Sequence, residues 1–204
     1  YQARSTTPCD DQMPLDFKFR SRQDLFTSRS RWADLDAIYV GFKGGDNRTN
    51  HGHLDIGSFV LDAVGERWAL DLGGDSYNLP GYFGARRWQF YRLNKHSHNI
   101  LAINGQLQDT AAHCDVVSFH SSSSNANAIV DMTDAYQDQM DSARRGIARL
   151  DRRAVHVRDE IAGTLGRIRW GMVTGADISI HGNRAVLIQN GKTLLAEVLA
   201  PGRN

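Results

Sequence analysis

The sequence predicts an all-β domain, an antiparallel β-sandwich, and three observations favour this fold class. Short runs rich in β-branched and aromatic residues recur along the chain at the spacing of an all-β domain. Between Arg153 and Glu160, apolar and polar side chains partly alternate, which is typical of a strand with one buried and one wet face. The dipeptide Asn190-Gly191 separates two such runs and is the strongest short hairpin signal. Two stacked sheets would bury the apolar faces of these strands.

The predicted elements follow a polar N-terminal stretch. Residues 1–14 contain two prolines and no periodicity, so we expect a connector or frayed terminus there and a single sandwich domain over residues 15–204. Strands are predicted at residues 37–43 and 57–63, and residues 67–72 return across a glycine-containing loop to form a hairpin. The further predicted strands are residues 98–104, 115–119, 128–133, 143–150, 153–161, 168–173, 184–189 and 192–199.

Composition sets limits on function. The 204 residues are 41% hydrophobic and 23% charged with a net charge of +1, which argues against disorder and against a global field that draws the protein onto nucleic acid. No apolar run approaches the roughly 20 residues that span a bilayer. Cys9 and Cys114 fit neither a paired metal motif nor a disulfide framework, and whether they pair stays open. The chain begins without Met and ends just after an apolar run, so we expect a piece of a longer protein.

The long segment without strand character, residues 75–94, is rich in aromatic residues. A loop of this size is usually a lid or a binding wall. It also contains Arg86, Arg87 and Trp88. Arginine forks match carboxylate or sulfate, and aromatic faces stack on sugar rings, so an acidic polysaccharide would suit this loop. The arginines between Arg144 and Arg153, by contrast, are interpreted as the solvated face of two adjacent strands.

The densest polar cluster lies between two predicted strands, at residues 44–55. In an extended His-x-His both imidazoles point to the same side, so His51 and His53 could share a ligand or divide two roles. The alternative is a pair of surface histidines in a loop.

Other potential metal ligands lie near the same sheet end. Asp71 ends the return strand of the hairpin, and His96 and His98 open the next strand. Two imidazoles, one carboxylate and an open position for water form a zinc-type set, and Asp55 is a further donor. The alternatives are that Asp71 caps the glycine turn after it and that His98 is a half-buried histidine with its own hydrogen bonds.

Several blocks taken together resemble the heparinase II/III-like polysaccharide lyases. The blocks are YVGFKGG at residues 39–45, NHGHLDIGSF at 50–59, WALDLG at 68–73, YNLPGYF at 77–83, and His98-Asn99. The similarity is good from about residue 37 to 104 and looser over residues 128–173. In two respects the sequence departs from the family pattern: Ser97 stands where the family commonly has Gly, and His96 is a rival ligand to His98.

The resemblance implies a fragment of a larger protein, built from an N-terminal α/α-toroid and supersandwich-like β-sheets, of which this chain matches part of the sheet portion. Members of the family cleave acidic uronate-containing polysaccharides, such as heparin, heparan sulfate or alginate, by β-elimination. The toroid supplies most of the catalytic groups, so the fragment alone is expected to be inactive. The partners implied are the acidic polysaccharide and the toroid, with no nucleic acid and no membrane, in a periplasmic or secreted protein.

The resemblance also distributes roles among the residues. His51 is the expected catalytic residue, and a mainly structural Zn2+ is expected on His53, Asp71 and His98. The expected substrate-binding residues are Asn50, Arg48, Tyr82, Arg87 and Trp88. Two other hypotheses stay open: a non-catalytic carbohydrate-binding or structural metal-containing β-sandwich, and a metal-dependent hydrolase that uses His51 and His53 together.

Overall fold

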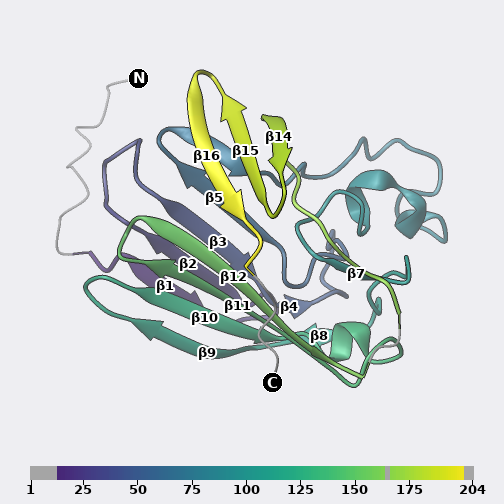
Figure 1. Cartoon of the computed structure of the whole chain (residues 1–204). Helices are drawn as coiled ribbons and strands as arrows, with labels where there is room; N and C mark the ends of the chain where they lie inside the picture. Colours follow the sequence, from purple (N-terminus) through teal and green to yellow (C-terminus); the bar gives the residue numbers. More distant parts are fainter. Residues whose placement is uncertain (1–12, 164–165, 200–204) are drawn as a thin grey trace, which may run out of the picture.

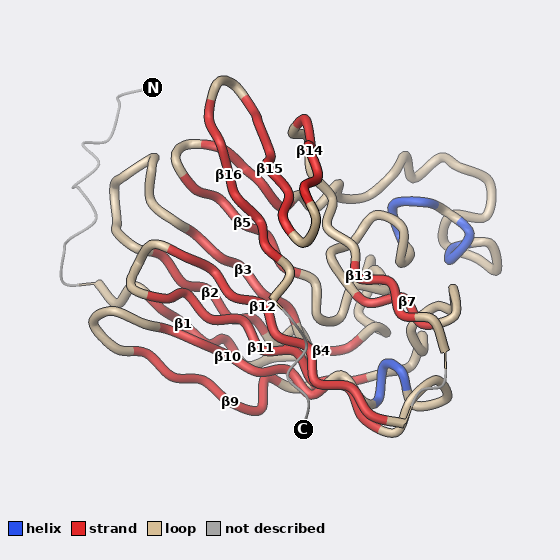
Figure 2. The backbone as a smooth tube through the Cα atoms, in the orientation of Figure 1, coloured by secondary structure: helices blue, strands red, loops and turns tan. Residues whose placement is uncertain are grey.

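The computed structural model describes residues 13–163 and 166–199 and consists almost entirely of antiparallel strands (Figure 1). Helical structure in the described part is limited to three short 3-10 turns, η1 (Arg87–Gln89), η2 (Tyr91–Leu93) and η3 (Asp134–Tyr136), which Figure 2 shows among strands and loops. Among the described residues, no helix is long and apolar enough to cross a membrane. The predicted all-β antiparallel fold is therefore confirmed.

Two sheets form the body of the domain. The first has the order β1-β2-β3-β5-β6 and the second the order β12-β11-β10-β9. The strands of the first sheet are β1 (Asp16–Phe19), β2 (Leu25–Arg29), β3 (Tyr39–Lys43), β5 (Phe59–Ala63) and β6 (Glu66–Ala69). Those of the second are β9 (Val116–Ser121), β10 (Ala126–Asp131), β11 (Ser142–Leu150) and β12 (Ala154–Ala162). The second sheet lies in front of the first in Figure 1.

The hydrophobic core fills the space between these two sheets. Phe26 and Phe42 of the first sheet and Val130 and Ile147 of the second belong to one buried cluster, each with at most 1% of its surface exposed. Strand alternation places them all inward, since successive side chains point to opposite faces. Burial of apolar surface at this interface is the main force that holds the sandwich together.

Smaller sheets complete the domain. β14 (Asp177–His181), β15 (Arg184–Gln189) and β16 (Lys192–Glu197) form a three-stranded sheet that lies above β5 in Figure 1. The predicted hairpin at Asn190-Gly191 is confirmed, and Gln189 and Asn190 donate hydrogen bonds to Glu66 of β6. Two further pairs are β4 (Gly45–Asp46) with β8 (His113–Cys114), and β7 (Leu101–Ile103) with β13 (Ile168–Trp170).

The predicted strands differ from the observed ones in a few places. The strand expected over residues 98–104 is wrong at its start, because only Leu101–Ile103 is strand and His98 lies in the preceding loop. β1, β2, β4, β8 and β14 were not predicted. The aromatic segment at residues 75–94 has no strand, as expected. Of the expected N-terminal connector, residues 1–12 lie outside the described residues, and so does Cys9.

Candidate functional site

An open hollow of about 300 Å³ lies beside the loop that joins β4 to β5. This is the loop that contains the predicted His51 and His53. The residues that line the hollow are Gln23, Lys43, Thr49, Asn50, His51, Gly52, His53, Asp55 and Asp71. The structure therefore brings the polar cluster of residues 44–55 and the distant Asp71 to one place.

Asp46 fixes the start of this loop. Its carboxylate accepts hydrogen bonds from Nε and Nη2 of Arg48, at 2.9 and 3.0 Å, and from the backbone amide of Arg48 at 2.7 Å. The guanidinium of Arg48 lowers the pKa of Asp46 to about 2, against the effect of burial. The backbone carbonyl of Asp46 also accepts bonds from Thr49 and Gln23. These bonds close the turn that precedes His51.

His51 projects from this turn at the rim of the hollow. Its φ of 62° lies in the left-handed region, and its side chain is exposed. The ring stacks on Tyr77 and meets the edge of Phe83, with centroids 5.4 and 5.5 Å away. The expectation of an extended His-x-His is therefore wrong: His51 sits in a turn because the loop is closed by hydrogen bonds rather than by a neighbouring strand. His51 and His53 have separate surroundings.

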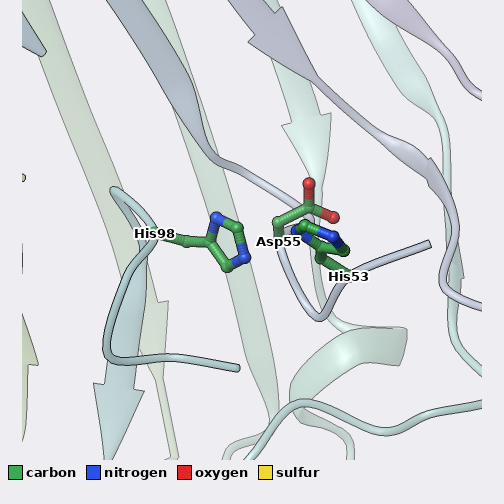
Figure 3. A group of neighbouring side chains, drawn as sticks. All are labelled: His53, Asp55 and His98. Carbon is green, nitrogen blue, oxygen red and sulfur yellow. The ribbon is translucent and has the colours of Figure 1, made fainter. Parts of the chain in front are cut away.

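His53, Asp55 and His98 form a group of metal-ligating side chains. One possible ligand atom from each lies within 4.8 Å of the others, and Figure 3 shows the His98 ring facing the other two across a gap. Among the described residues this is the group of three such donors that lies close enough for one ion. Burial lowers the pKa of His53, which favours the neutral imidazole that binds metals.

The buried ring of His98 supports a metal at this point. Its two nitrogens have no hydrogen-bond partner within the described part of the chain, and the residue is only 2% exposed. A buried polar atom without a partner is costly, and native proteins avoid it. A cation would satisfy one of these nitrogens, so the residues present fit the metal that the donor set suggests.

Asp71 also lies close to His98. Its Oδ2 lies 3.4 Å from Nδ1 of His98, without the alignment of a hydrogen bond. The proximity of His98, together with a hydrogen bond from the amide of Gly73, lowers the pKa of Asp71 to about 2 despite its partial burial. Asp55, in comparison, is already ion-paired with Lys43. Of the two carboxylates, Asp71 is the one without a lysine or arginine partner among the described ion pairs.

His96 does not join this group. Its side chain is exposed, and its ring lies parallel to Tyr91 with the centroids 6.3 Å apart. Between the two rival histidines, His98 is the one that faces His53, at a centroid distance of 5.2 Å.

The residues predicted to bind substrate differ in how exposed their side chains are. Arg48 and Asn50 are exposed beside His51. Arg87 donates hydrogen bonds to the carbonyls of Gly52 and Tyr82, at 2.6 and 3.2 Å, so it ties the aromatic loop to the histidine loop.

The two aromatic candidates are more enclosed. Tyr82 is only 2% exposed because it packs against Tyr77, Phe83 and Phe90. A ring so enclosed supports Tyr77 and Phe83, which contact His51, and does not present a face to a ligand. Trp88 is half-buried, and the guanidinium of Arg87 lies over its ring at 5.1 Å.

The interpretation of residues 144–153 as a solvated basic face is wrong for two arginines. Arg145 and Arg149 are both fully buried, and they form ion pairs with Asp159 and Asp16. They occupy alternate positions of β11 together with Ala143 and Ile147, and strand alternation turns that whole set toward the core. Arg144, at the position between, is exposed as predicted.

Sequence reasoning also missed parts of the site. It identified the aromatic loop but not that Tyr77 and Phe83 contact His51. It named Asp55 only as a further donor.

Cys114, the described cysteine, is buried, and burial raises its thiol pKa to about 12.

Solved structures share this fold. The chain superposes on a mutant of heparan sulfate lyase HepC from Pedobacter heparinus with a TM-score of 0.72 and 18% identity, over 88% of this chain and 28% of that one. A heparinase III structure gives 0.69 and 16%, over 88% and 28%. The heparinase III BT4657 gene product gives 0.66 and 18%, over 84% and 26%. The chain thus spans less than a third of each of these proteins.

A search of curated proteins found no match. The sequence of residues 29–201, in contrast, matches the family described as heparinase II/III-like, C-terminal, which is most of the chain and includes every residue of the hollow except Gln23. The chain therefore belongs to the heparinase II/III-like family, as its C-terminal domain.

Proposed function

We propose that this chain is the β-sheet domain of a polysaccharide lyase that cleaves acidic, uronate-containing polysaccharides by β-elimination. The observation that carries this proposal is the combination of the family match over residues 29–201 with an exposed His51, held on an aromatic stack at the rim of the hollow. The family comprises heparinase-like proteins, and the structural relatives carry the names of heparan sulfate lyases and heparinases.

The reaction needs three contributions. A base removes the C5 proton of the uronate, the bond from C4 to the leaving oxygen breaks, that oxygen takes a proton, and a C4=C5 double bond remains. Neutralisation of the uronate carboxylate stabilises the charge that develops in the transition state. We propose that His51 touches the sugar and that Arg48 and Asn50, which are exposed in the same loop, bind polar groups of the polymer.

We further propose a structural zinc on His53, Asp71 and His98, with Asp55 as an additional donor. Two imidazoles and a carboxylate are typical zinc ligands. His53 and His98 lie close enough for one ion together with Asp55, Oδ2 of Asp71 lies 3.4 Å from Nδ1 of His98, and the unpartnered nitrogens of the buried His98 favour a cation. The ion would supply a fixed point that joins the loop of His53 to that of His98. His51, two residues before His53 in the same loop, would then keep a defined place without binding the ion itself.

The remaining catalytic groups are proposed to come from an N-terminal helical toroid of the same protein. The hollow is open, and His51 is the histidine at its exposed rim. A second surface would be needed to enclose a sugar chain and to exclude water from it. We therefore propose that this chain alone binds polymer weakly and cleaves it little. A periplasmic or secreted location is proposed from the substrate class.

The test compares this chain with a longer protein that includes the helical domain. Each is mixed with heparan sulfate and with alginate, and the ultraviolet absorbance of conjugated product ends is followed. The longer protein is expected to produce unsaturated ends from one of these polymers, and His51→Ala to abolish most of that activity. His96→Ala removes an exposed histidine outside the hollow and is expected to leave the rate unchanged. Polymer binding without any cleavage by the longer protein would favour the carbohydrate-binding alternative.

A further inference from the structure

The buried guanidinium of Arg145 joins the two loops that carry the metal-ligating side chains. Its Nε and Nη2 donate to the two carboxylate oxygens of Asp159, at 2.7 and 2.9 Å. Its Nη1 donates to two backbone carbonyls, that of Gly57 at 2.9 Å and that of Asn99 at 2.7 Å. Asp159 thus holds the guanidinium plane in place while one nitrogen bridges two segments that are far apart in the sequence.

Both bridged carbonyls lie close to candidate ligands. Gly57 follows Asp55 by two residues in the loop of His53, and Asn99 is the neighbour of His98. A single nitrogen atom of β11 therefore bridges these two loops, which are also joined by a hydrogen bond from the amide of Asn99 to Oγ of Ser58 at 3.2 Å. The distance between the two loops is the one that an ion shared by His53 and His98 has to match.

Asn99 extends the connection to the third segment. Its Nδ2 donates to the carbonyls of Phe59 and Leu70, at 2.6 and 3.0 Å, and Leu70 is the neighbour of Asp71. Its Oδ1 accepts from the amide of Val173 at 2.6 Å. The segments of His53, His98 and Asp71 are thus tied to one hydrogen-bonded hub made by Arg145 and Asn99.

We infer that Arg145 is a positioning residue of the metal site: it sets the spacing between the His53 loop and the His98 loop from the opposite sheet. This inference rests on the metal site of the proposed function. A guanidinium suits this task because it is planar and directs several N–H groups at fixed angles. A lysine ammonium is a compact charge on a flexible side chain and has no such fixed arrangement of donors. Groups behind the ligands that orient them commonly influence metal affinity strongly.

The same strand offers a matched control. Arg149 is as buried as Arg145, pairs with Asp16 and donates to Ser28 and to the carbonyl of Ser124. None of these partners lies in a segment that carries a candidate ligand. A lysine at position 149 therefore disturbs the core in a similar way without touching the hub.

The experiment measures Co2+ binding by the purified chain and by its Arg145→Lys and Arg149→Lys variants. Affinity is obtained by competition with a chelator, and the visible absorption of Co2+ reports its coordination geometry. Urea unfolding of the metal-free proteins gives the stability of each. We expect both variants to lose stability, but only Arg145→Lys to bind Co2+ more weakly, by about 10- to 100-fold, with an altered visible spectrum.

Three results would overturn the inference. Arg145→Lys could bind Co2+ with the affinity and spectrum of the unaltered chain, or Arg149→Lys could weaken binding as much as Arg145→Lys does. Either result removes the positioning role and leaves the proposed zinc site intact. If the unaltered chain bound no Co2+ at all, the zinc site and the inference would fall together.

A milder pair of variants covers the case in which Arg145→Lys does not fold. Asp159→Asn removes the charge that holds the guanidinium of Arg145, and Asp16→Asn does the same for Arg149. Asp159→Asn is expected to weaken Co2+ binding at least about threefold, and Asp16→Asn to leave it unchanged. Equal affinities in the two variants would contradict the inference.

Discussion

The imidazole of His51 lies nearly parallel to the phenol ring of Tyr77, with centroids 5.4 Å apart and 15° between the planes. His51 belongs to the loop between β4 and β5, and Tyr77 to the aromatic segment that follows β6. The orientation of the proposed catalytic ring is thus set by a different part of the chain from the one that carries it.

Replacement of Tyr77 by Ala should therefore reduce catalysis more than stability. The stack contributes about 0.5–1.5 kcal/mol, whereas a misplaced catalytic group can cost about 100-fold in rate. We expect the proposed lyase activity of a longer protein that includes the helical domain to fall about 10- to 100-fold. Tyr91→Ala is the control, because Tyr91 is an exposed ring of the same segment that stacks on His96 instead. Equal losses in the two variants would refute a specific role for Tyr77.

Two replacements of His51 separate its ring from its backbone. His51 has a φ of 62°, which glycine adopts freely and other residues adopt at a cost. His51→Ala and His51→Gly both lose the ring, so we expect both to lose activity. Because only the glycine variant relieves the strain, it should be more stable than the alanine variant by about 1 kcal/mol in urea unfolding. A glycine variant that is the less stable of the two would show that the turn is not strained.

Metal binding should distinguish the two carboxylates near His98. Asp55 is ion-paired with Lys43, while Oδ2 of Asp71 lies 3.4 Å from Nδ1 of His98. We expect Asp71→Asn to weaken Zn2+ binding more than Asp55→Asn, as measured by competition with a chelator. The reverse order would assign the ion to His53, Asp55 and His98.

Zinc should also stabilise the folded chain. An ion that binds only the folded state adds about 2.7 kcal/mol when its free concentration is 100 times its dissociation constant. The unfolding midpoint should rise with added Zn2+ and fall with a chelator in the unaltered chain, and His98→Ala should remove this response. A midpoint that does not depend on zinc would rule out the site.

The pH dependence of the free energy of unfolding should reveal how much the Asp46 carboxylate stabilises the turn before His51. Arg48 lowers the pKa of Asp46 from its usual 3.8 to about 2, so the folded state binds this proton more weakly than the unfolded chain. The stabilisation is then complete above about pH 4 and disappears as the pH falls towards 2. Asp46→Asn should lower the free energy of unfolding by about 1–2 kcal/mol at pH 7, and by much less near pH 2. A difference that stays constant with pH would contradict this account.

Gly57 is a position that should accept no side chain. Its φ is 84°, and a Cβ there would overlap Sδ of Met132. Gly57→Ala should therefore cost about 2–4 kcal/mol, from backbone strain and overpacking together. Gly182 also has a positive φ, but a methyl group added there would meet no atom within 4 Å, so Gly182→Ala should cost only about 1 kcal/mol. Urea unfolding checks both, and similar losses would exclude the contact with Met132 as a cause.

The fold class and several strands could be predicted because they depend on local patterns. β3, β5 and the hairpin of β15 and β16 have β-branched runs and a recognisable turn. β1 and β2 could not be predicted in the same way. β1 is only four residues long, and LFTSR in β2 is too polar to signal a strand by itself. The segment LFTSR becomes a strand because it pairs with β3 and buries Phe26.

The burial of Arg145 and Arg149 shows a second limit. The alternation of Ala143, Arg145, Ile147 and Arg149 in one strand is visible in the sequence and places all four on one face. Their partners Asp159 and Asp16 are not visible, because one lies on the neighbouring strand and the other 133 positions away. Burial of an arginine without a charged partner costs too much free energy, so the sequence alone does not predict it.

The separation of the candidate ligands along the chain has a further consequence. An ion held by both His53 and His98 would close a loop of about 45 residues and act as a removable cross-link of the folded chain. A chelator that removes the ion is therefore expected to release the connection between the His53 and His98 segments.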